Sequence, residues 1–162
     1  MSGLAIQRLT EERRLWRREH PPGFIARPRT TKEGTPDLLT WDCGIPGAKG
    51  TEWEGGIYPL TMEFTEEYPT RPPKCRFPKG FYHPNIYPSG TVCLSILNEE
   101  QDWRPSISVK QILLGIQELL NTPNTLSPAQ PEAFKDITNN KELYHSKVQK
   151  QRIQYDQEKF TL

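Results

Sequence analysis

The sequence is short of cysteine, of net charge and of long apolar runs, and each shortage excludes a class of protein. Its three cysteines are an odd number without a CxxC pair, so neither a disulfide framework nor a zinc site is expected. A formal net charge of +1 provides no overall field for recruiting nucleic acid or an anionic membrane. No apolar run approaches the roughly 18 residues that span a bilayer, and the N-terminus lacks the features of a signal peptide. We therefore expect an intracellular protein with neither nucleic acid nor a membrane as partner.

The apolar and aromatic residues that are present suffice for one hydrophobic core. Apolar residues make up 34% of the chain and charged residues 25%, with four Trp, six Tyr and six Phe. These bulky side chains can offset the chain entropy lost on folding. A chain of 162 residues is too short for two full domains without a visible linker, so we expect one domain over residues 1–162.

The spacing of apolar residues predicts an α+β fold in the order helix, strands, helices. The helix that begins at Ser108 has Gln111 at capping-box spacing and apolar residues at helical spacing, so we expect it at the centre of the core. The other expected elements are a first helix capped by Ser2 and running to about Glu19, antiparallel strands over residues 24–27, 39–45 and 60–64, a short fourth strand around residues 74–77, and two last helices over residues 130–138 and 141–160.

The three thiols differ in their surroundings. Cys43 and Cys75 lie at inward-facing positions of predicted strands, so both are expected to be inert core residues. Cys93 instead follows the turn at residues 87–91, at the end of a connection over residues 68–90 that contains six prolines. Loops stiffened in this way usually hold functional groups in place. Cys93 is therefore the candidate nucleophile.

His83 and Asn85 precede Cys93 in the same stiffened segment, which invites comparison with a cysteine hydrolase. However, a His followed by Pro is fixed in an extended or turn backbone, so we expect His83 to be a structural hydrogen-bonding residue. A thiol that only accepts an acyl group and passes it on needs little local base. It needs an oxyanion donor and a dehydrated, aligned amine.

Four segments together resemble the ubiquitin-conjugating enzyme family, and the resemblance spans nearly the whole chain. They are HPN at residues 83–85, GTVCLSIL at 90–97, the YP and PP pairs at 68–69 and 72–73, and WRP at 103–105. Within this family the chain is most similar to the SUMO-conjugating branch, through the residues 87–93, the long acidic segment 98–102 and the arginine-rich first helix.

The resemblance implies a fold with four helices and a four-stranded meander, and an acyltransferase activity. SUMO would be accepted from its activating enzyme as a thioester on Cys93 and transferred to a substrate lysine, forming an isopeptide bond. It implies no metal and no cofactor. The implied partners are SUMO, the SUMO-activating enzyme, SUMO ligases and substrates with a hydrophobic-Lys-any-Glu acceptor. We expect a monomer in the nucleus and cytoplasm.

The resemblance also assigns roles around Cys93. Asn85 corresponds to the family's oxyanion residue, either as a donor to the oxyanion or as the support of the loop that donates; the alternative is a turn asparagine that satisfies backbone groups. Tyr87 and Ser127 correspond to walls of the lysine channel, where a dry setting lowers the pKa of an amine. Many relatives have Asp in place of Ser127, so we assign Ser127 hydrogen bonding to the amine.

Two further groups of residues are assigned by the same resemblance. Lys74 and Arg76 would bind the acidic residue of the acceptor. The substrate groove would be completed by Ser89, Thr91, Pro128, Ala129, Gln130 and Phe134.

On the first helix, Ala5, Leu9 and Trp16 share a face that we expect to be buried. The resemblance implies that the surface for a second, noncovalent SUMO and for the activating enzyme lies on another side of this helix and consists of Arg13, Arg14, Arg17, Arg18 and His20. The alternative is a solvated charged face, since three glutamates of the same helix partly balance the arginines.

Three other functions remain open from the sequence. The first is a ubiquitin-conjugating enzyme with the same chemistry. The second is a non-catalytic module of this fold that binds a modifier, against which the presence of Cys93 argues. The third is a cysteine hydrolase, which would act without any partner.

Overall fold

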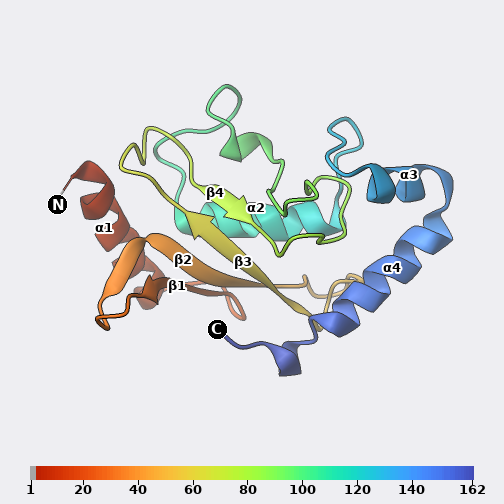
Figure 1. Ribbon diagram of the computed structural model, residues 1–162, viewed down its shortest axis with the longest axis horizontal. Coiled ribbons are helices and arrows are strands. Elements are labelled where there is room, and N and C mark those ends of the chain that lie inside the picture. Colours follow the sequence, from red (N-terminus) through yellow and green to blue (C-terminus); the bar gives the residue numbers. More distant parts are fainter. Residues whose placement is uncertain (1–2) are drawn as a thin grey trace.

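The structure is a computed structural model that describes residues 3–162. A first helix, α1 (Leu4–Arg18), is followed by a four-stranded antiparallel sheet and then by further helices (Figure 1). The strands are β1 (Ile25–Thr30), β2 (Pro36–Pro46), β3 (Ile57–Glu63) and β4 (Lys74–Arg76), and they are hydrogen-bonded in the order β1-β2-β3-β4. The α+β fold with an N-terminal helix and an antiparallel meander is thus confirmed.

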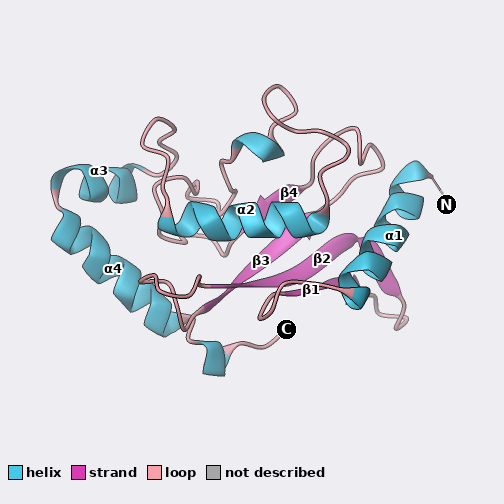
Figure 2. Cartoon of the chain, turned by 180° about the vertical axis from the view of Figure 1, so that it is seen from behind, coloured by secondary structure: helices cyan, strands magenta, loops and turns pink. Residues whose placement is uncertain are grey.

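The helix α2 (Val109–Asn121) lies along one face of the sheet in both views (Figures 1 and 2). The predicted capping box is present: the Ser108 side chain accepts from the Gln111 N–H, and the Gln111 side chain accepts from the Ser108 N–H. The six apolar residues of its buried face are Val109, Ile112, Leu113, Ile116, Leu119 and Leu120. Opposite them, alternate residues of β2 point inward and are buried, including Trp41, Cys43 and Ile45. The prediction of a central core helix is confirmed.

The helix α1 lies at one end of the sheet and contributes Ala5, Leu9 and Trp16 to the core, as predicted. Its N-cap position is Gly3; the predicted cap Ser2 lies outside the described residues. The sequence reasoning missed that Glu12 is also buried on this face.

The helices α3 (Pro131–Asn139) and α4 (Lys141–Gln154) lie at the opposite end of the molecule from α1 (Figures 1 and 2). The predicted extension of the last helix to Phe160 is wrong. The helix ends at Gln154 because the Tyr155 carbonyl accepts from the Ile57 N–H at 2.9 Å, and the next residue pairs with Gly56 at the end of the sheet. The chain then folds back so that the Phe160 ring covers Gly44, where an added Cβ would lie 2.8 Å from the ring.

Two features of residues 3–162 concern membranes and metal ions. None of the helices described is both long and apolar enough to cross a membrane. No cluster of three or more His, Cys, Asp or Glu side chains in this part of the chain is arranged to hold a metal ion.

Candidate active site

The three thiols separate by burial as the sequence predicted. Cys43 and Cys75 are each 1% exposed, and burial raises the pKa of both thiols, which keeps them protonated and unreactive. Cys93 is partly exposed and lies in a surface groove. Of the cysteines in the chain, Cys93 alone is therefore available to a reaction partner.

The groove around Cys93 has a volume of about 960 Å³ and lies between three loops. Tyr87 lines it from the loop before the nucleophile, and Ser127 and Pro128 line it from the loop after α2. The Cys93 thiol raises the pKa of the neighbouring Tyr87 hydroxyl, so this hydroxyl remains a protonated donor. Three of the predicted site residues thus share a groove with Cys93.

His83 is completely buried and both of its ring nitrogens are occupied. Nδ1 accepts from the Asn85 N–H at 3.0 Å, so Nε2 carries the proton and donates to the Leu119 carbonyl at 2.9 Å. Burial lowers the pKa of His83 to about 4, and the imidazole is neutral at physiological pH. The prediction of a structural role is confirmed, and His83 cannot serve as a base for Cys93.

Asn85 joins the segment of the nucleophile to the loop after α2. Its Nδ2 donates to the carbonyls of Asn124 at 2.8 Å and Ser127 at 2.7 Å, and its Oδ1 accepts from the Asn124 N–H at 2.8 Å. Its backbone carbonyl accepts from the Cys93 N–H at 2.9 Å. Since both amide protons are engaged, donation to an oxyanion would require the loss of one of these bonds. Of the roles predicted for Asn85, the geometry favours support of the loop.

Ser127 lines the groove. The only hydrogen bond that its Oγ accepts from the described residues is a long one of 3.3 Å from Asn124 Nδ2. This arrangement leaves the hydroxyl proton available to a group that enters the groove.

Two residues predicted to contact substrate are instead buried. Ala129 is 8% exposed and its N–H donates to the Pro84 carbonyl at 2.9 Å. Gln130 is 9% exposed, and its Nε2 donates to the carbonyls of Phe81 at 2.7 Å and Ile86 at 3.0 Å. Their contacts therefore brace the loop, and the expectation that they face substrate is corrected. Phe134 is half-buried on α3 and does not line the Cys93 groove.

The residues predicted to bind the acidic part of an acceptor lie outside the Cys93 groove. Lys74 is exposed, and Arg76 forms an ion pair with Glu63 at 2.8 Å. Arg76 is bridged through its backbone to Thr91, whose hydroxyl lies 3.0 Å from that of Ser89. The backbone bridge places Arg76 next to the active-site segment, while Arg76 and Ser89 line a separate groove on the outer face of the sheet.

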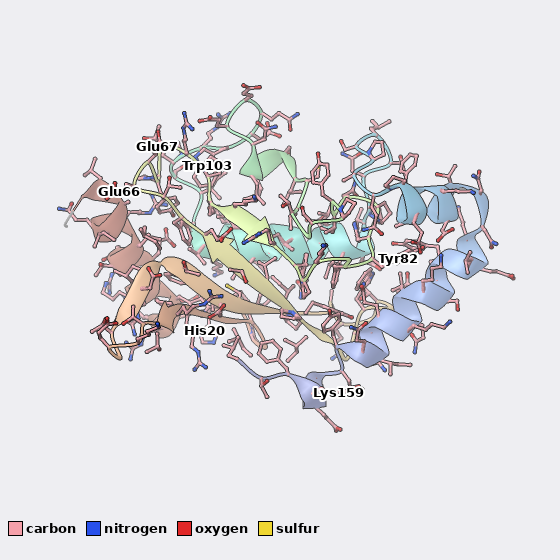
Figure 3. All side chains as sticks on the ribbon, in the orientation of Figure 1. His20, Glu66, Glu67, Tyr82, Trp103 and Lys159 are labelled. Atoms are coloured by element: carbon pink, nitrogen blue, oxygen red, sulfur yellow. The ribbon has the colours of Figure 1, made fainter. Side chains whose placement is uncertain are left out.

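The predicted basic surface lies on α1. Arg17 and Arg18 are exposed, as is Arg14, which pairs with Glu11. Arg13 is half-buried and lines a groove with the β1 arginines. His20 follows the end of α1 (Figure 3), and its ring stacks on Trp16 with 5.1 Å between centroids.

The sequence reasoning missed the polar residues of α3 and α4 that hold this site. Asp136 and Gln151 are both 7% exposed, and both bind Tyr82, the residue before His83. The signal for Gln151 was its spacing: it continues the buried stripe of Tyr144 and Val148 along α4. A polar residue on an apolar stripe marks a buried hydrogen-bonding partner.

Comparison with known proteins agrees with this architecture. Residues 8–152 match the model of the ubiquitin-conjugating enzyme family. The chain therefore belongs to the ubiquitin-conjugating enzyme family.

Three relatives within this family match almost their whole length. The Sumo-conjugating enzyme of Dictyostelium discoideum is 61% identical, and the match covers 93% of this chain and 95% of the relative. The SUMO-conjugating enzyme of Arabidopsis thaliana is 57% identical, covering 95% of this chain and 96% of the relative. That of Caenorhabditis elegans is 53% identical, covering 96% and 93%.

Proposed function

We propose that this protein is a SUMO-conjugating enzyme, a transferase that accepts SUMO as a thioester on Cys93 and passes it to lysine. One observation carries the proposal: Cys93 is a partly exposed thiol in a groove, and the nearby His83 is neutral, buried and fully bonded. Such a site suits an acyl carrier better than a hydrolase, which would need that base. The modifier is inferred from three relatives that are 53–61% identical and are named SUMO-conjugating enzymes.

The reaction consists of two acyl transfers. The Cys93 sulfur attacks the thioester carbonyl on the activating enzyme, a new C–S bond forms, and the activating enzyme's thiol leaves. A lysine amine then attacks the Cys93 thioester, a C–N bond forms, and the Cys93 thiol leaves. The lysine ammonium gives one proton to solvent before the neutral amine attacks, and the second proton, lost as the amide forms, goes to the departing Cys93 sulfur.

Tyr87 and Ser127 would prepare the lysine amine for attack. The amine has an ordinary pKa of about 10.4 and must lose its proton. Entry between the Tyr87 ring and the loop of Ser127 and Pro128 removes water from it and lowers its pKa. Because Ser127 has no carboxylate, it contributes a hydrogen bond, and desolvation supplies most of the activation.

We further propose how the partners bind. Lys74 and Arg76, next to the active-site segment, would bind the acidic residue of a hydrophobic-Lys-any-Glu acceptor, and Ser89, Thr91 and Phe134 would contribute to acceptor binding. The α1 surface of Arg13, Arg14, Arg17, Arg18 and His20 would bind the SUMO-activating enzyme and a second, noncovalent SUMO.

The domain organisation, oligomeric state and cellular location of the protein are also proposals. We propose that residues 1–162 act as one catalytic domain, as a monomer that works with SUMO ligases in the nucleus and cytoplasm and requires no cofactor.

A thioester-charging assay tests whether the protein accepts SUMO or ubiquitin. The protein is incubated with ATP and either SUMO with its activating enzyme or ubiquitin with its own, and the products are separated on a non-reducing gel. We expect an adduct with SUMO alone, lost on adding a thiol reductant. An adduct formed only with ubiquitin would support the thioester mechanism but show that the modifier is ubiquitin and not SUMO. No adduct with either modifier would favour a non-catalytic modifier-binding module.

A further inference from the structure

The buried polar side chains of this protein are concentrated on one short segment, residues 81–86. Within residues 3–162, six polar or charged side chains are buried. Five of them belong to this segment or donate to or accept from it: His83, Asn85, Gln130, Asp136 and Gln151. Because burying a polar group is unfavourable unless it is bonded, such a concentration indicates a segment whose geometry is tightly specified.

Gln151 of α4 binds both backbone groups of Tyr82. Its Oε1 accepts from the Tyr82 N–H at 2.7 Å, and its Nε2 donates to the Tyr82 carbonyl at 3.0 Å. One side chain thus takes the place of a neighbouring strand for the residue that directly precedes His83. No other side chain among those described bonds to these two backbone groups.

The side chain of Tyr82 is held by the same pair of helices. Its hydroxyl donates to Asp136 Oδ2 on α3 at 2.7 Å, and Lys147 on α4 donates to the same oxygen at 2.7 Å. Lys147 Nζ also lies 5.5 Å from the centre of the Tyr82 ring. Figure 3 labels Tyr82 where the active-site segment meets α4. Backbone and side chain of Tyr82 are therefore both fixed to α3 and α4.

Tyr82 is joined to His83 by the peptide bond, and two hydrogen bonds lead from His83 to Cys93. His83 Nδ1 accepts from the Asn85 N–H at 3.0 Å, and the Asn85 carbonyl accepts from the Cys93 N–H at 2.9 Å. Gln130 holds the next carbonyl, that of Ile86, at 3.0 Å. A shift of the Tyr82 backbone would therefore move Asn85 and, through it, the backbone of Cys93.

We propose that Gln151 is a positioning residue for the transfer of SUMO to lysine. The helices α3 and α4 form a template that fixes the active-site segment through Tyr82, and Gln151 is its main contact with the backbone. The proposal rests on the proposed function, since the step that it affects is the attack of lysine on the Cys93 thioester. That attack depends on alignment, because a misplacement of about 1 Å can cost about 100-fold in rate.

The test is single-turnover discharge of the preformed Cys93 thioester to a lysine acceptor. For Gln151→Leu we expect a rate at saturating acceptor at least about tenfold below that of the wild type, with the acceptor KM unchanged within about twofold. The matched control is Val148→Ala, one turn earlier on α4, which removes buried volume but no hydrogen bond to Tyr82. Both variants are assayed at a temperature where circular dichroism shows them folded.

A second variant separates positioning from loss of stability. In Gln151→Glu the ionised carboxylate can accept from the Tyr82 N–H but cannot donate to its carbonyl, whereas the protonated carboxyl can do both. Burial raises the pKa of such a carboxyl, so the ratio of variant to wild-type discharge rate should rise as pH falls from about 8 to about 6. A defect that does not depend on the protonation of residue 151 would give a flat ratio.

The proposal is overturned if Gln151→Leu discharges as fast as Val148→Ala, or if the Gln151→Glu ratio does not change with pH. Failure of the proposed function would appear at the charging step, before discharge is measured. In that case the wild type itself forms no SUMO thioester, and both proposals fall.

Discussion

His83 lies ten residues before the nucleophile, yet both of its ring nitrogens are directed to backbone groups. The bonds of Asn85 are likewise made to the backbone, on the loop after α2. Together these two side chains set the path of the chain, and the proposed reaction would leave its proton movements to solvent, the incoming amine and the departing Cys93 sulfur.

The buried imidazole should make stability depend on pH. The pKa of His83 is about 4 in the folded protein against about 6.5 in the unfolded chain, so the unfolded state binds the proton more tightly. Its contribution of about 3 kcal/mol is fully present above pH ~6.5 and is lost as pH falls to about 4. Urea unfolding across this range should show the decline. In His83→Gln the decline should be smaller; an equal decline would contradict the assignment.

Tyr87 and Ser127 should affect discharge to lysine and leave charging unchanged. Loss of the desolvating ring in Tyr87→Ala is expected to slow discharge about tenfold, equivalent to about 1.4 kcal/mol. Ser127→Ala removes one hydrogen bond and should slow it by about fivefold or less. Thioester formation with the activating enzyme serves as the internal control. If charging fell in parallel with discharge, the role in activating the amine would be wrong.

At the scale of elements, α1 and α2 are joined by a buried carboxylate. Glu12 Oε1 accepts from the Val109 N–H at the start of α2 at 3.0 Å, and Oε2 accepts from Arg8 at 2.9 Å. Arg8 in turn donates to the carbonyls of Pro105 and Ile107, just before α2. The carboxylate also compensates the positive end of the α2 dipole.

Removal of this carboxylate should destabilise the protein. In Glu12→Ala the Arg8 guanidinium loses its carboxylate partner and the buried Val109 N–H loses its acceptor. We therefore expect a loss of about 3 kcal/mol in the free energy of unfolding. Urea denaturation measures it. The matched control is Glu11→Ala, whose exposed ion pair with Arg14 should contribute little. A Glu12→Ala variant as stable as this control would show that the buried link is unimportant.

Elements were predictable from the sequence where local patterns decide them. The capping box and apolar spacing of α2 were sufficient, because both signals lie within the helix itself. The end of α4 was not, because it depends on a backbone bond between Tyr155 and Ile57, nearly a hundred residues apart in the chain. The first three strands were recognised but placed too short, since pairing with a neighbour extends them beyond their apolar cores.

At the scale of the whole molecule, α1 with its basic surface and the α3–α4 pair lie at opposite ends (Figures 1 and 2). The sequence singled out Cys93 because it ends a proline-rich connection, and the resemblance to the family assigned Tyr87, Ser127 and Pro128, which line the same groove. It could not show that Ala129 and Gln130 turn inward, because their burial depends on contacts with the distant segment 81–86.

The α1 surface gives a prediction at this scale. Arg13→Glu combined with Arg17→Glu should weaken noncovalent SUMO binding, most strongly at low salt, because the interaction is electrostatic. Isothermal titration at two salt concentrations measures it, with circular dichroism to show an unchanged fold. The matched control is Lys79→Glu, on the outer face of the sheet. Unchanged affinity of the α1 variant would exclude this surface.

The most direct test of the central claim is intact-mass spectrometry of the charged protein, followed over time with and without a lysine acceptor. The account predicts one SUMO added with loss of water, absent in Cys93→Ala, present in the Cys43→Ala and Cys75→Ala variants, and lost to lysine much faster than to water. An adduct that persists in Cys93→Ala, or one that is hydrolysed as fast as it is transferred, would contradict the assignment of Cys93 as an acyl carrier.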